Sequence, residues 1–335
     1  MGWVERSETH HLAKRPRPIW RVSLRSSHPT GFGRRSLHVD RIVMEGNHLL
    51  QQTALSLSLL SGSVSSRSMT LDRSAYDISD QILARVSNFA VGLVIRGGKG
   101  SKVLGSGVFA TIEGRRGILT CGHVAEQYEK LSEIGIIRFV ASGHQRRILK
   151  LGETQAVIVQ SSDTFEEAKE VLDLAFTVLS PDLASSVEAH SVFLNIDKNR
   201  AKMEAMASSK GKNVDAMLGL IAEFSQEPFI EGTQVVSLMR GALHTGRVSA
   251  QENGLLTFKA MDYNVPEMPK CFGGMSGAGV WRVYYVESEK ETKVVEAMLC
   301  GVTSWQIDDT KLACQGWDRI DQMLVPTVRD KSWKF

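Results

Sequence analysis

A serine within a glycine-rich stretch is the part of this sequence best suited to carry chemistry. Residues 270–281 read KCFGGMSGAGVW, in which Ser276 precedes an apolar run. The pattern predicts a tight loop that leads into a strand. A nucleophilic serine requires such a loop, because a substrate carbonyl must reach the hydroxyl while backbone N–H groups point at the resulting oxyanion. Gly274 and Ser276 are the natural donors, although a Gly/Ser cluster between strands can also be an ordinary turn.

The positions of the histidines limit the class of serine hydrolase that this sequence could form, because the serine hydroxyl needs an imidazole to take its proton. No histidine follows Ser276, and Ala278 interrupts a GxSxG elbow. These two features exclude the order serine, acid, histidine of the α/β-hydrolases. The candidate base is His123, which stands in GILTCGHVAE between an apolar strand and a predicted helical turn. Polar or connecting segments hold the other histidines after residue 68, namely His144, His190 and His244.

An acid must orient the imidazole, and Asp173 is the candidate. In VLDLAFTVL it is the single charged residue of an apolar strand. A buried, unpaired carboxylate costs several kcal/mol, so Asp173 needs a partner, and the Nδ1–H of His123 is the obvious donor. Asp163, the competing acid, lies in the polar run SSDTFEE and is expected to be solvated.

The order and setting of these residues resemble the chymotrypsin/trypsin-like serine peptidases in their bacterial, disulfide-free form. The matching motifs are LTCGHV, DLAFTVL, GGMSGAGV and GVTSW at 301–305, and the likeness covers roughly residues 85–325. It implies a serine endopeptidase that acts through an acyl-enzyme. Ser276 would be the nucleophile, His123 the general base, and Asp173 the group that fixes the imidazole tautomer. The N–H groups of Gly274 and Ser276 would form the oxyanion hole.

The resemblance also implies residues that bind the substrate. Ser304 would support Asp173, and the backbone around Trp305 would pair with an extended peptide as an added strand. Lys270 aligns with the base of the specificity pocket, where a cation would favour an acidic side chain. Gly316 would form part of the opposite pocket wall.

One departure from the family pattern concerns activation. Met275 stands where many members carry an aspartate that a newly cut N-terminus activates. Control of that kind is therefore not expected, and the oxyanion hole should be formed from the start.

Short β-rich runs, separated by glycines and polar turns, must position these groups. Their spacing predicts an all-β fold of two antiparallel six-stranded β-barrels, trypsin-like, with the site in the cleft between them. Barrel 1 is expected at about 85–185 and barrel 2 at about 229–310. The predicted strands are 90–95, 107–112, 117–120, 136–140, 148–151, 156–159, 172–179, 233–239, 246–250, 255–259, 279–286, 294–300 and 301–305.

Helices are expected at three places in a peptidase domain of residues 69–335. An amphipathic lead-in covers 71–88. A helical insertion covers about 198–225, because Met217, Leu218, Ile221 and Phe224 fall on one helical face. A surface hairpin packed on the body is favoured over a regulatory lid or a partner site. A C-terminal helix covers about 320–329, with a kink or an early end at Pro326.

The first 68 residues differ from the rest in charge. They hold ten basic and four acidic residues, a net +6, while the whole chain carries +3, so residues 69–335 sum to −3. The segment lacks an apolar period and is predicted to be unfolded. A transit sequence and a basic nucleic-acid-binding arm are alternatives, but WVERSETHH at 3–11 looks like the translation of an intergenic repeat found upstream of many bacterial genes. The favoured interpretation is a true start at Met69.

Composition bounds the remaining possibilities. The hydrophobic content of 42% and charged content of 23% are those of an ordinary soluble protein. Free, mostly buried thiols in a reducing, cytoplasmic compartment are expected, since no CxxC pairing or zinc spacing occurs among Cys121, Cys271, Cys300 and Cys314. No metal and no cofactor is expected, and the expected partner is a protein or peptide substrate rather than nucleic acid or a membrane.

Two other functions remain open at this stage. A catalytically inactive module of the same fold could bind extended peptides without cutting them. An esterase could use the same triad. Nucleic-acid binding through residues 1–68 is a weaker third interpretation.

Overall fold

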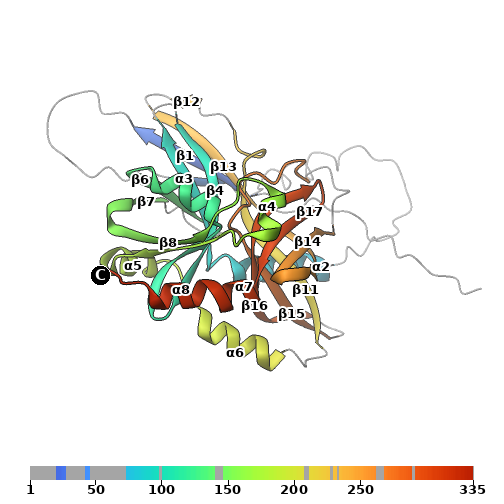
Figure 1. Ribbon diagram of the computed structural model, residues 1–335. Coiled ribbons are helices and arrows are strands. Elements are labelled where there is room, and N and C mark those ends of the chain that lie inside the picture. The colour runs from blue at the N-terminus through green and yellow to red at the C-terminus, as the bar shows by residue number, and fades with distance from the viewer. Residues whose placement is uncertain are drawn as a thin grey trace, which may run out of the picture.

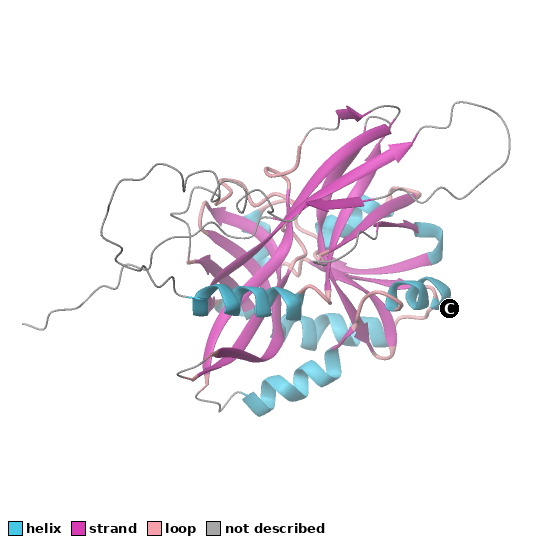
Figure 2. Cartoon of the chain, turned by 180° about the vertical axis from the view of Figure 1, so that it is seen from behind, coloured by secondary structure: helices cyan, strands magenta, loops and turns pink. Residues whose placement is uncertain are grey.

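Two β-sheets form most of the protein. The computed structural model describes residues 20–27, 42–45, 73–97, 100–139, 146–206, 211–226, 229–231, 234–261, 268–288 and 291–334. Strands make up the body of the molecule and most helices lie on its outside (Figure 1, Figure 2). The mostly β character, the antiparallel pairing and the C-terminal helix agree with the prediction.

The first sheet contains the strands that lead to His123 and Asp173. Its order is β7-β6-β3-β4-β5-β9-β8, all antiparallel, and the short β10 (Leu194–Asn195) pairs parallel with β4. The bounds are β3 (Ala90–Gly97), β4 (Gly100–Ile112), β5 (Arg115–Thr120), β6 (Glu133–Arg138), β7 (Arg146–Lys150), β8 (Thr154–Gln160) and β9 (Leu174–Leu179).

The second sheet carries Ser276 and Ser304. Following its antiparallel pairs from β11 through β15, β16, β17, β14 and β13 leads back to β11, which pairs with both β15 and β13. The short β12 (Phe229–Glu231) also pairs with β13. The bounds are β11 (Lys212–Ile221), β13 (Gln234–Ala250), β14 (Leu255–Ala260), β15 (Gly279–Glu287), β16 (Thr292–Asp308) and β17 (Lys311–Gly316).

Two strands come from the N-terminal segment. β1 (Trp20–Ser27) pairs antiparallel with β13, and β2 (Ile42–Glu45) pairs with β1. The prediction of an unfolded segment is therefore wrong for these two stretches. The rest of residues 1–68, and Met69 itself, lie outside the described residues.

The predicted helical insertion is only half helical. α6 (Ile196–Met206) is a helix, but β11 is a strand, so the prediction of a helix through Met217, Leu218 and Ile221 is wrong. Phe224 follows the strand in a turn. β11 is buried from Asp215 to Ile221, because it lies between β13 and β15 and both its faces are covered. A strand buried on both faces shows no alternation, which is why its apolar run resembles a helical face. As a core strand it cannot serve as a lid.

The predicted strand set of the second sheet also changes. The runs predicted at 233–239 and 246–250 belong, from Gln234 on, to one long strand, β13, and those at 294–300 and 301–305 belong to β16. β11 and β17 complete the ring of pairs. Glycines within the long strands suggested turns, whereas they mark close packing: a Cβ at Gly246 would lie 2.4 Å from the carbonyl oxygen of Lys259.

The N-terminal and C-terminal helices agree with the prediction. The lead-in is α2 (Arg73–Val86), whose Gln81 side chain donates to Thr292 O at 2.8 Å and accepts from Val294 N at 2.8 Å. At the C-terminus, α7 (Trp317–Arg319), η3 (Ile320–Leu324) and α8 (Val325–Asp330) follow without interruption. Pro326 does not end the helix. It lies in the first turn of α8, directly after the wider π-helical turn of η3.

The remaining helices are short and connect strands. They are α3 (Gly122–Glu129), η1 (Leu151–Glu153), α4 (Phe165–Glu170), α5 (Pro181–Glu188) and η2 (Glu252–Gly254).

Within the described part of the chain, no helix combines the length and the apolar character needed to cross a membrane.

The two sheets share a hydrophobic core. Phe176 and Leu119 of the first sheet and Leu218 and Trp281 of the second belong to one buried cluster. Trp281 is fully buried and stacks on Phe89 with ring centroids 5.4 Å apart. Each sheet also has a cluster of its own. The shared cluster fixes the sheets against each other, so residues from both can meet at one site.

Asn199 of α6 provides a test of how the helices are attached. Its buried side chain donates to Leu299 O and accepts from Leu299 N, both at 2.9 Å, where β17 does not yet pair with β16. We expect Asn199→Ala to lower the free energy of unfolding by about 2 to 4 kcal/mol, because it leaves a buried N–H and a buried C=O without partners.

Urea denaturation measures this change, and the exposed neighbour Lys198→Ala is the control. A loss for Asn199→Ala as small as that of the control would show that the amide pair does not hold α6 to the sheet.

Candidate functional site

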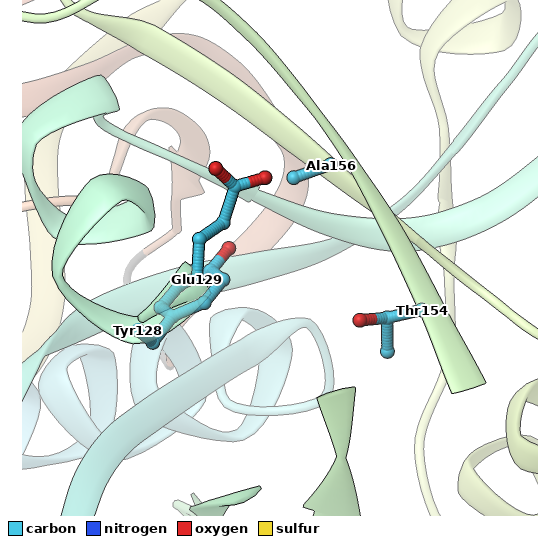
Figure 3. Close-up of a pocket in the computed structure, with 4 residues that line it drawn as sticks. All are labelled: Tyr128, Glu129, Thr154 and Ala156. Carbon is cyan, nitrogen blue, oxygen red and sulfur yellow. The ribbon is translucent and has the colours of Figure 1, made fainter. Parts of the chain in front are cut away.

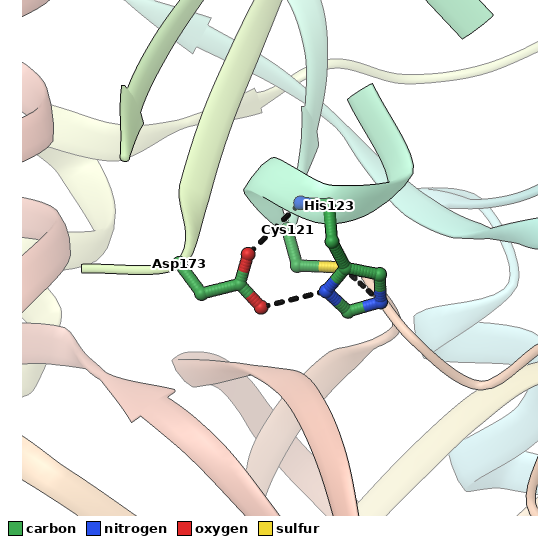
Figure 4. A group of neighbouring side chains, drawn as sticks. All are labelled: Cys121, His123 and Asp173. Atoms are coloured by element: carbon green, nitrogen blue, oxygen red, sulfur yellow. Dashed lines mark hydrogen bonds and ion pairs between the residues drawn. The ribbon is translucent and has the colours of Figure 1, made fainter. Parts of the chain in front are cut away.

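His123 and Asp173 are in direct contact. His123 is the second residue of α3, and Asp173 lies immediately before β9 with no exposed surface. The carboxylate accepts from His123 Nδ1 at 2.8 Å and from the backbone N–H of the same residue at 2.9 Å (Figure 4). With Nδ1 donating to the carboxylate, the other ring nitrogen of a neutral imidazole is left free to accept a proton.

Ser304 of β16 is the third donor to this carboxylate. Its buried hydroxyl donates to Asp173 Oδ2. Asp173 therefore accepts three hydrogen bonds, which offset the cost of burying its charge. This contact joins the first sheet to the second at the site.

Ser276 lies next to the same strand. Its partly buried hydroxyl donates to the backbone oxygen of Ser304 at 3.1 Å. No hydrogen bond joins Ser276 directly to His123 among the described residues. The structure thus brings His123, Asp173 and Ser304 into contact and links Ser276 to them through Ser304.

The loop before Ser276 has its peptide planes fixed by hydrogen bonds. Gly273 O accepts from Ala222 N at 2.7 Å, and Met275 O accepts from the hydroxyl of Thr303 at 2.9 Å and from Ala278 N at 2.8 Å. These carbonyls belong to the peptides that carry the N–H groups of Gly274 and Ser276. In a trans peptide the N–H points away from the C=O. Each of the two N–H groups is therefore held in the direction opposite to the carbonyl of its own peptide. Neither of them donates to another described residue.

Ser106 of β4 attaches this loop to the first sheet. Its N–H donates to Ser276 O and its hydroxyl to Gly274 O, each at 2.7 Å. The approach requires glycine at Gly277, where φ is +87° and a Cβ would lie 2.1 Å from Ser106 O. Gly274 also has a positive φ, +94°. The glycines noted in the sequence are thus required by the backbone conformation of the loop.

Trp305 packs against the imidazole. The ring centroids of Trp305 and His123 are 4.5 Å apart, and the indole N–H donates to the buried hydroxyl of Ser162 at 2.9 Å. The loop after β8 therefore holds the indole ring in place beside His123. Sequence reasoning missed Ser162, since nothing in SSDTFEE distinguishes it from the polar residues around it.

Two predicted binding residues lie farther from this group. The side chain of Lys270 is exposed, and its backbone oxygen accepts from Gln306 Nε2 at 3.1 Å. Gly316 lies opposite Gly301 in the sheet, where a Cβ would lie 2.5 Å from Gly254 O. Close packing explains this glycine, and its assignment to a pocket wall stays a prediction.

Cys121, which the sequence predicts only as a buried thiol, is also a neighbour of His123. Its Sγ lies 3.6 Å from His123 Nε2, and the two residues form with Asp173 a group of the composition that can bind a metal. Two observations argue against a metal site. The carboxylate is already occupied by three donors, and Figure 4 shows the sulfur behind the face of the imidazole rather than at the edge where the Nε2 lone pair points.

The ionisation of Cys121 supports the same conclusion. Burial raises the pKa of this thiol well above its ordinary value, and the charge of Asp173 raises it further. A thiol that stays protonated is a poor metal ligand and a poor nucleophile. Cys121 is therefore best described as a small side chain that packs against the ring of His123.

A small cavity lies near the other end of α3. Tyr128, Glu129, Thr154 and Ala156 line it, and its volume is about 200 Å³ (Figure 3). The Tyr128 hydroxyl pairs with Thr177, and burial raises the pKa of this tyrosine. None of the candidate catalytic residues lines this cavity.

Comparison with known proteins gives little further information. Neither the protein-family models nor the curated proteins include a match to this sequence. Among the solved structures, one from work on aromatic interactions in the coupled folding and binding of the intrinsically disordered Sesbania mosaic virus VPg protein aligns with a TM-score of 0.39. The alignment has 14% sequence identity and covers 71% of this chain and 90% of that one. A similarity this low supports no argument about fold or function.

The cysteines provide a test of the site's geometry. Cys271 is exposed, whereas Cys121, Cys300 and Cys314 are buried, and burial raises the pKa of Cys300 to about 12. At pH 8 the three buried thiols are therefore protonated as well as inaccessible. We expect Ellman's reagent to modify one thiol rapidly in the native protein and four in denaturant, with the rapid reaction lost in Cys271→Ser.

Mass spectrometry of the labelled peptides identifies the residue. Rapid modification of Cys121 instead would mean that its thiol is ionised beside His123, contrary to the packing described above.

Proposed function

We propose that this protein is a serine endopeptidase of the trypsin-like type, in which the two sheets are two β-barrels and the site lies between them. The observation that carries the proposal is the buried contact of Asp173 with both His123 and Ser304. The closed ring of strand pairs in the second sheet supports the barrel assignment for that half of the molecule.

The first step of the proposed reaction is attack by Ser276 on the substrate carbonyl. The hydroxyl turns from Ser304 O toward His123, and Nε2 takes its proton as Oγ bonds to the carbonyl carbon. Asp173 keeps the Nδ1–H in place and stabilises the imidazolium that forms. His123 then gives the proton to the leaving amine, and water releases the acyl group by the same sequence of steps.

The negative oxygen formed in this step would be bound by the N–H groups of Gly274 and Ser276. Their peptide planes are fixed by Ala222, Thr303 and Ala278, so the donors need not reorganise when charge develops. Loss of one such donor typically costs about 10² to 10³ in kcat. The fixed planes support an oxyanion hole that is formed without cleavage of the chain.

The substrate would be an extended peptide that lies along the backbone of 304–306. The side chain of Lys270 is exposed, and the preference of the protein for substrates with an acidic side chain stays a prediction. A cytoplasmic location likewise stays a prediction.

The second candidate is a peptide-binding module without catalysis, which the lack of a direct Ser276 to His123 hydrogen bond favours. In crystal structures of free enzymes such bonds are often long and tighten only when substrate binds, so the hydrolase is preferred. An esterase with the same triad is distinguished by kinetics on matched ester and amide substrates.

An active-site-directed fluorophosphonate tests the proposal. We expect the wild type to be labelled and to cleave peptides, and both activities to disappear in Ser276→Ala, because the proposed reaction needs this hydroxyl as its nucleophile. Mass spectrometry should place the label on residue 276.

Cys121→Ser is the matched control, since it removes the only thiol in contact with His123 and should retain labelling. A well-folded wild type that is never labelled would support the binding module. Loss of activity in Cys121→Ser, with retention in Ser276→Ala, would transfer the nucleophile to the thiol.

A further inference from the structure

Gln306 occupies an unusual place beside the candidate site. It lies two residues after Ser304 on β16, and its side chain crosses to the loop that leads to Ser276. Its Oε1 accepts from Phe272 N at 2.8 Å, and its Nε2 donates to Lys270 O at 3.1 Å. A third hydrogen bond, from Nε2 to Asp308 O at 3.2 Å, holds the amide from its own strand.

This inference rests on the proposed hydrolase function, which fixes where a substrate side chain must go. A carbonyl carbon at Ser276 Oγ, with its oxygen at the N–H groups of Gly274 and Ser276, belongs to a peptide that runs along 304–306. In that pose the side chain of the residue would lie between the strand segment 304–306 and the loop 270–274. Gln306 joins these two walls.

We infer that Gln306 is a specificity-determining residue that closes this space to all but small side chains. Glycine, alanine and serine fit in front of the bridging amide, whereas phenylalanine, leucine, lysine or glutamate must displace it. The side-chain amide accepts one hydrogen bond from the loop and donates the other to it. Exchange of its oxygen and nitrogen would break both, so the amide is fixed in one orientation.

The loop cannot easily move aside to enlarge the space. On its other side Cys271 N donates to Glu223 Oε2 and Gly273 O accepts from Ala222 N, each at 2.7 Å. Phe272 is buried in the core of the second sheet and packs edge to face on His244. The loop is therefore held by Gln306, by residues 222–223 and by the packing of Phe272 in the core. The size limit would thus be present before a substrate binds.

Diphenyl phosphonates of alanine, phenylalanine and glutamate test the inference, because they label without needing turnover. Each reacts when Ser276 Oγ bonds to phosphorus and phenoxide leaves, with the hydroxyl proton passing to His123. We expect the wild type to react at least about 50-fold faster with the alanine compound than with the phenylalanine compound. In Gln306→Ala this ratio should fall by about tenfold or more.

Two further variants isolate the role of the side chain. Gln306→Glu keeps the length and the acceptor for Phe272 N but loses the donor to Lys270 O, so the ratio should fall less than in Gln306→Ala. Ile307→Ala changes the exposed neighbouring residue of β16 and should leave the ratio unchanged. The rate with a small fluorophosphonate reports whether each variant retains an intact site.

The outcomes separate the inference from the function on which it rests. A wild type that reacts with the fluorophosphonate but equally fast with the alanine and phenylalanine compounds overturns the inference and leaves the hydrolase standing. A preference for the glutamate compound would assign specificity to Lys270 instead. If no compound labels a folded wild type, the hydrolase proposal fails and the inference fails with it.

Discussion

The burial of one carboxylate governs the arrangement of the candidate site. Asp173 has no exposed surface, and a charge in that position persists only where donors surround it. Two of the three donors come from His123 at the start of α3, and the third comes from Ser304 in the other sheet. The cost of desolvating the carboxylate thus requires a histidine and a serine from two halves of the chain to be adjacent.

The same dependence between the sheets appears in the loop that carries Ser276. Ser106 of the first sheet binds the carbonyls of Gly274 and Ser276, while Thr303 of the second binds that of Met275. Glycine is required where the two backbones approach most closely. The N–H groups of Met275 and Gly277 are engaged, whereas those of Gly274 and Ser276 donate to no other described residue and stay available for a ligand.

The sequence predicted the contacts of Asp173 with His123 and Ser304 better than the elements around them. An aspartate inside an apolar strand and a histidine after another are strong signals, since burial of a charge permits few arrangements. β11 was missed because a strand covered on both faces has no alternating pattern. The long strands β13 and β16 were each divided at glycines that serve packing rather than turns. Contacts between distant residues, such as Trp305 with Ser162 and Gln306 with Phe272, have no local signature and required the structure.

The two-sided attachment of the Ser276 loop has a consequence for partial unfolding. Its geometry requires hydrogen bonds from both sheets, so separating the sheets would dismantle the loop even if each sheet kept its own strands and core. The geometry of the candidate site therefore depends on an interface inside a single chain, much as sites formed between subunits depend on their association. A substitution that loosens the shared core around Trp281 would therefore disrupt the geometry of the candidate site, although it changes none of the residues of that site.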